Sequence, residues 1–179
     1  DEDLFSSVWK SAKNRWLWLA VNLGTAFFAS RVIGMFEDSI EKLVALAALM
    51  PIVAAIAGNS GNQTVALIVR ALAFEEINKS NAKGLLRKEL AIAVVNGILW
   101  GSVAGAFAWL LYGNIALGLV MLGAMLLNLI VGAGVGMLVP LFLQKMGRDP
   151  AIGSSVLLTF STDSMGFLIF LGLATVFLV

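Results

Sequence analysis

Long apolar runs separated by short polar connections dominate the chain. Five of these runs are long enough to cross the roughly 30 Å hydrocarbon core of a bilayer, which takes about 20 residues of helix. They cover Trp16–Phe36, Leu43–Phe74, Leu90–Tyr112, Ile115–Leu143 and Ala151–Val179. The runs are continuously apolar and do not alternate, which excludes a transmembrane β-barrel. The pattern therefore predicts an all-α integral membrane bundle of five transmembrane helices.

Lysine and arginine residues gather on one side of this arrangement. Most of them precede the first run or flank the second and fourth connections, whereas Arg31 and Lys42 fall on the other side, beside Glu37, Asp38 and Glu41. Positive residues near the ends of spans favour the cytoplasmic side. We therefore expect a multi-pass protein of the cell inner (plasma) membrane, with a cytoplasmic N-terminus and the C-terminus outside.

Residues 1–14 are too short and too polar to span a membrane. Leu4, Phe5, Val8, Trp9 and Ala12 nonetheless recur at helical spacing, opposite a polar face. This pattern predicts an amphipathic helix on the cytoplasmic interface over residues 1–14, followed by a transmembrane domain over residues 15–179. A frayed linker is the alternative for the first segment.

Composition supports a membrane protein and narrows its chemistry. The 179 residues are 60% hydrophobic and only 13% charged, whereas soluble domains carry about a quarter charged residues. The net charge of +1 provides no basic face for nucleic acid. Without Cys or His, the chain has no thiolate or imidazole ligands and no Ser-His or Cys-His nucleophile pair, so we expect no enzyme. A hard cation held by oxygen atoms or water remains compatible.

Asp163 is the one carboxylate inside a predicted span, near its middle. A charged side chain there costs at least about 2.5–3.5 kcal/mol. Ser155, Thr159 and Asp163 follow at i, i+4 and i+8, with Thr162 and Gly166 beside them. This polar stripe predicts one wall of a wet cavity that leads to Asp163; a protonated Asp163 bonded to a neighbouring helix is the alternative.

The second run is expected to break. Pro51 removes a helical hydrogen bond, and two glycines and three amides follow it within 58–64, namely Gly58, Asn59, Gly61, Asn62 and Gln63. Non-helical backbone at membrane depth persists only when it is buried in protein or lines water. We therefore predict that carbonyl and amide oxygens of this segment line a cation pathway; a kink that serves packing is the alternative.

Two further glycine patterns predict close helix packing and no site. Gly97, Gly101 and Gly105 follow at i, i+4 and i+8 in the third run. A similar line in the fourth run consists of Asn128, Gly132, Gly136 and Pro140.

Two ordered motifs resemble those of the MgtE magnesium transporters. The segment 51–64, PIVAAIAGNSGNQT, is similar to the second-helix signature of that family. Asp149-Pro150-Ala151, with Thr162-Asp163 and Gly166 downstream, is similar to its fifth-helix signature. The resemblance covers essentially the whole chain.

This resemblance implies a homodimeric Mg²⁺ channel whose pore, on the two-fold axis, is lined by the second and fifth helices. Asp163 would bind a largely hydrated Mg²⁺ with backbone carbonyls from around Gly58 and Thr159, and Asp149 would lie at the cytoplasmic mouth. The pore lining would include Asn59, Gly61, Asn62, Gln63, Ser155, Thr162 and Gly166. Mn²⁺, Co²⁺ or Ca²⁺ could also be carried. Two facing Asp163 carboxylates repel each other and a divalent ion neutralises both, which agrees with a dimer.

Other interpretations remain at this point. Members of the family usually carry cytosolic regulatory domains, which this chain lacks, so we expect either an excised membrane domain or a short member. An exchanger that couples Mg²⁺ to Na⁺ or H⁺ would use the same residues, and a membrane scaffold subunit would not transport. An intramembrane aspartyl protease needs two carboxylates that share a proton. One copy of this chain has a single carboxylate inside a predicted span, Asp163, which disfavours a protease.

Overall fold

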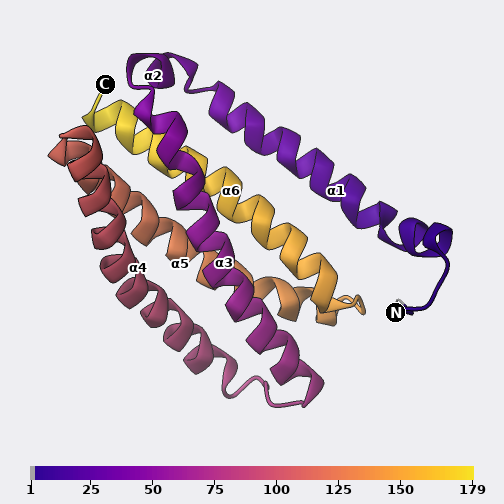
Figure 1. Ribbon diagram of the computed structural model, residues 1–179. Helices are drawn as coiled ribbons and strands as arrows, with labels where there is room; N and C mark the ends of the chain where they lie inside the picture. Colours follow the sequence, from indigo (N-terminus) through magenta and orange to yellow (C-terminus); the bar gives the residue numbers. More distant parts are fainter. Residues whose placement is uncertain (1–2) are drawn as a thin grey trace.

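The computed structural model describes residues 3–179, and all regular structure in this part of the chain is helical. The helices are α1 (Val8–Gly34), α2 (Glu37–Lys42), α3 (Ala45–Ala73), α4 (Ala82–Tyr112), α5 (Ile115–Lys145) and α6 (Pro150–Phe177). All except α2 are long and apolar enough to cross a membrane. The predicted all-α bundle of five membrane-capable helices is confirmed. The start of α1 and the end of α6 lie at opposite ends of the bundle (Figure 1).

Local chemistry explains where the helices begin and end. Asn114 starts α5 because its side chain accepts a hydrogen bond from the Leu117 backbone N–H over 3.2 Å, and Asp149 does the same for Ala151 at the start of α6 over 3.0 Å. Gly113 ends α4 with a left-handed φ of 64°, a conformation that glycine adopts without steric cost. The polar connections before α5 and α6 therefore cap the helices that follow them.

The helix α5 is the centre of the bundle. It packs against α3, α4 and α6, whereas α3 and α4 scarcely touch each other. The helix α1 lies on the outside and packs on α6 (Figure 1). The short α2 connects α1 to α3 and contacts the end of α6, where Ser39 and Thr175 share a hydrogen bond of 2.6 Å between their hydroxyl groups. This arrangement leaves α3 and α6 adjacent to each other and to α5.

The glycine pattern of the third run brings α4 into backbone contact with α5, as predicted. A Cβ atom built on Gly105 would lie 2.5 Å from the Gly118 carbonyl oxygen, and one on Gly101 would lie 3.0 Å from the Leu122 oxygen. On the other side of α5, Cβ atoms on Gly132 and Gly136 would lie 2.8 and 2.7 Å from backbone oxygens of α3. Helices that approach this closely gain dispersion contacts along their backbones.

The expected break in the second run is wrong. The helix α3 continues from Ala45 to Ala73 through Pro51 and through the whole segment 58–64. The glycines there serve close approach, because a Cβ on Gly61 would meet the Leu158 side chain at 2.6 Å and the Gly132 oxygen at 3.0 Å. Pro51 is accommodated within the helix without ending it.

The N-terminal segment also differs from the prediction. Residues 1–2 lie outside the described residues, and Leu4 and Phe5 are exposed and non-helical. From Val8 the chain is helical and continues without interruption into the first span, so the predicted interfacial helix is in part the first turns of α1. Its position at a membrane interface, and the division at residue 15, stay predictions.

Packing at Gly105 can be tested by Gly105→Ala. The added methyl group collides with the Gly118 backbone, which cannot rotate away, so we expect a loss of about 1–3 kcal/mol in stability. Gly84→Ala in the same helix is the control, because nothing lies within 4 Å of its built Cβ, and it should gain up to about 1 kcal/mol. Thermal unfolding in detergent measures the stability of both variants. Equal changes in stability would contradict the contact between Gly105 and Gly118.

Candidate functional site

Asp163 lies half-buried in the middle of α6. Among residues 3–179, its carboxylate has no hydrogen-bond or ion-pair partner. Ser155 and Thr159, two turns and one turn before it, are half-buried as well. A face of α6 that is neither sealed in the core nor fully open thus carries two hydroxyl groups and one unpaired carboxyl group.

The helix α3 meets this face at two levels. The Ser155 hydroxyl donates a hydrogen bond to the Asn62 side-chain oxygen over 3.1 Å. One turn before Asn62 on α3, a Cβ on Gly58 would lie 3.4 Å from the Thr162 hydroxyl oxygen, and Thr162 is next to Asp163 in sequence. The structure therefore places Asn62 beside Ser155 and Gly58 beside the buried Thr162; that they line a cation pathway stays a prediction.

Three of the predicted lining residues face the interior of the chain instead. Thr162 is fully buried, and its hydroxyl donates to the Leu158 carbonyl of its own helix over 3.1 Å. Gly166 is buried against the Asn128 side chain, and Gly61 against Leu158. Their small size allows helices to approach, so they do not line an open surface of the single chain.

The amides of α3 divide between two sides of the helix. Asn62 faces α6, whereas Asn59 and Gln63 line a groove of about 340 Å³ between α3 and α4, together with Asn96 and Trp100 of α4. Helical geometry causes this division, because successive residues of a helix point in directions about 100° apart. The segment 58–64 was predicted to be non-helical, so the sequence did not show that Asn62 faces α6 while Asn59 and Gln63 face α4.

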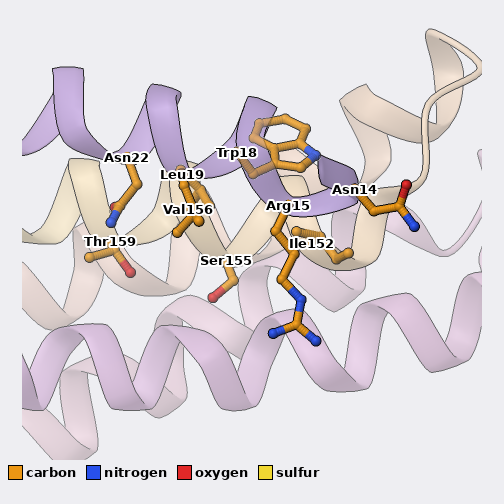
Figure 2. A pocket seen from close by; sticks show the side chains of 9 residues that line it. All are labelled: Asn14, Arg15, Trp18, Leu19, Asn22, Ile152, Ser155, Val156 and Thr159. Carbon is orange, nitrogen blue, oxygen red and sulfur yellow. The ribbon is translucent and has the colours of Figure 1, made fainter. Parts of the chain in front are cut away.

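A larger groove of about 680 Å³ adjoins the polar face of α6, on the side of α1. Figure 2 shows Ser155 and Thr159 of α6 in this groove with Asn22 and Arg15 of α1. Asn22 was not among the site residues predicted from the sequence. It could have been, because it is an amide within an apolar run, which is the feature that identified Asn62.

Asp149 has a structural role at the start of α6. Its side chain caps the helix by accepting a hydrogen bond from the Ala151 N–H, and the residue is exposed. The predicted role at a pore mouth stays a prediction.

The arrangement favours a hard cation over chemistry on a covalent substrate. Its donors are a carboxylate, hydroxyl groups and an amide oxygen, which are oxygen ligands. Within residues 3–179 there is no group of three acidic, His or Cys side chains that could hold a metal ion.

Comparison with known proteins agrees with this description. Residues 50–173 match the MgtE family, described as divalent cation transporter. The magnesium transporter MgtE of Bacillus subtilis is 34% identical over 94% of this chain, and that of Enterococcus faecalis is 30% identical over 99%. The Thermus thermophilus protein of the same name is 30% identical over 90%.

The chain spans only part of these relatives, 37% of the Bacillus protein, 39% of the Enterococcus protein and 36% of the Thermus protein. The comparisons and the five membrane-capable helices identify a multi-pass membrane protein. Because the family match covers more than half of its length, the chain belongs to the MgtE family of divalent cation transporters.

Proposed function

We propose that this chain moves Mg²⁺ across a membrane through a homodimeric pore lined by α3 and α6, and that Asp163 binds a largely hydrated ion there. The observation that carries the proposal is the half-buried Asp163 carboxylate, which has no partner among residues 3–179 and lies in the middle of a membrane-capable helix. The curated relatives, which are named magnesium transporters, support Mg²⁺ as the ion.

The chemistry of Asp163 fits this ion. A charged side chain in the membrane costs at least about 2.5–3.5 kcal/mol, unless it meets water or an opposite charge. Mg²⁺ keeps several waters and binds through one or two carboxylates. The hydroxyl groups of Ser155 and Thr159 and the carbonyl groups of Gly58 and Thr159 would hydrogen-bond those waters. Mn²⁺, Co²⁺ and Ca²⁺ are further candidates for transport.

A second copy of the chain completes the site. One chain supplies one carboxylate at this depth, and the polar face of α6 is only half-covered by α1 and α3. Polar groups at membrane depth must be buried in protein or face water. Two copies related by a two-fold axis would enclose the face and place two Asp163 carboxylates around one divalent ion, with charges that balance.

The orientation follows from the positive residues. Most of them lie in the first turns of α1, the last turn of α3, the first turns of α4 and the connection between α3 and α4. This end of the bundle is therefore proposed to be cytoplasmic. Asp149, at the start of α6, is then at the cytoplasmic mouth of the pore. The membrane is the cell inner (plasma) membrane, with the C-terminus outside, and residues 1–14 lie at the cytoplasmic interface.

Flux into liposomes tests the role of Asp163. In Asp163→Asn the neutral amide loses a charge-assisted interaction of about 1.5–3 kcal/mol with the ion or its waters, so we expect Mg²⁺ uptake to fall roughly tenfold to hundredfold. A Mg²⁺-sensitive dye inside the liposomes measures the rate. Asp38→Asn, the same change at an exposed residue of α2, should leave uptake unchanged.

The outcomes separate the candidate functions. Full uptake in Asp163→Asn would refute the pore proposal, and no uptake in the parent chain would favour a scaffold. Uptake that requires a Na⁺ or pH gradient would replace the channel by an exchanger.

The contact between Ser155 and Asn62 gives a second test. Ser155→Ala removes the donor of this hydrogen bond, worth about 1 kcal/mol, and we expect the Mg²⁺ concentration for half-maximal uptake to rise roughly fivefold. Ser161→Ala is the matched control, since the Ser161 hydroxyl bonds the Leu157 carbonyl of its own helix. Equal effects of the two variants would mean that the contact has no special role.

A further inference from the structure

One side chain of the central helix joins the two helices that face each other at the proposed site. Asn128 of α5 is fully buried. Its amide nitrogen donates to the Val53 carbonyl of α3 over 3.2 Å and to the Thr162 carbonyl of α6 over 3.0 Å. Both hydrogens of the NH₂ group are thereby used, one for each helix.

The link on α6 lies directly at the proposed ion site. The Thr162 carbonyl belongs to the peptide group that joins Thr162 to Asp163. Asn128 therefore holds the backbone from which the Asp163 side chain extends. On α3, Val53 lies between one and two turns before Gly58.

The surrounding residues are small enough to let this side chain reach both backbones. A Cβ on Gly166 would lie 2.6 Å from the Asn128 amide nitrogen and 3.4 Å from the Ala54 Cα. Gly132, one turn after Asn128 on α5, would place a Cβ 2.8 Å from the Ala57 carbonyl oxygen. At this level α3 and α6 therefore lie close together, and one amide of α5 bonds a backbone carbonyl of each.

This amide has an energetic cost that simple packing does not require. Its oxygen is buried and has no hydrogen-bond partner in the described part of the chain, which costs about 1–3 kcal/mol. Turning the amide over would place that oxygen against two carbonyl oxygens, which repel it, so the orientation is determined. The two hydrogen bonds that the NH₂ group donates are therefore what this buried side chain contributes.

We propose that Asn128 is a positioning residue, which sets the separation of α3 and α6 at Asp163 and thereby the size of the hydrated-ion site. The inference rests on the proposed function. Mg²⁺ demands near-ideal octahedral geometry, whereas Ca²⁺ accepts longer and more variable distances. Loosening the link therefore lowers the preference of the pore for Mg²⁺ over Ca²⁺.

A double-mutant cycle with Gly166 separates positioning from packing. Asn128→Ala removes both hydrogen bonds and leaves a hole beside Gly166. In Gly166→Ala the added methyl group pushes the amide away from its acceptors. We expect each single variant to lower the melting temperature and to reduce the ratio of Mg²⁺ to Ca²⁺ uptake in liposomes by about tenfold, the effect of roughly 1.4 kcal/mol.

The double variant gives the decisive result. The methyl group that Gly166→Ala adds occupies part of the space that the amide has left, so the melting temperature recovers in part. The uptake ratio stays low, because neither carbonyl is held. Asn96→Ala, which removes an amide in the groove between α3 and α4, is the control and should keep the parent ratio.

Two results would overturn the inference. One is an uptake ratio that recovers together with the melting temperature in the double variant, and the other is a parent ratio in both single variants. Should Asn128→Ala give no folded protein, Gly166→Ala carries the test by itself. A failure of the proposed function itself is recognised separately. In that case Asp163→Asn would keep its Mg²⁺ uptake, whatever the Asn128 variants do.

Discussion

An uncompensated carboxyl group in the middle of a membrane-capable helix is the constraint on which the rest of this structure depends. Asp163 finds no partner among residues 3–179, and lipid cannot solvate its charge. The hydroxyl groups on the same face of α6, and Asn62 and Gly58 of α3 beside them, provide a polar surrounding. Protonation, water or a cation from outside the chain has to supply the compensation, and the proposed function uses water and a cation.

Backbone contact between helices provides the rigidity that such a site needs. The central helix α5 approaches α4 through Gly105 and Gly118, and α3 through Gly132 and Gly136. Lipid gives no hydrophobic drive for helices to associate, so close contact and hydrogen bonds between helices replace it. Asn128 of α5 provides two such bonds, to Val53 of α3 and to Thr162 of α6, next to Asp163.

The course of α3 shows that a motif of proline and glycines does not by itself predict whether a helix breaks. Proline and paired glycines predicted a broken helix, because both residues destabilise helices in isolation. The structure keeps α3 continuous and uses Gly61 for contact with Leu158 and the Gly132 carbonyl. Glycine permits either outcome, and only the neighbouring helices determine which one is realised.

The sequence by itself determined the all-α class and the number of membrane-capable helices, because each span requires a continuous apolar run long enough for the bilayer. It did not determine the helix bounds, since α1 and α4 begin at Val8 and Ala82, ahead of the predicted runs, and α2 lies in a predicted connection. It also identified Asp163, since a carboxylate in such a run is conspicuous. Tertiary structure decided which polar residues share a surface. Asn62 was brought to Ser155, Asn59 and Gln63 were turned toward α4, and Gly166 was buried against Asn128. The reason is that the direction of a side chain around a helix has meaning only once the neighbours of that helix are in place.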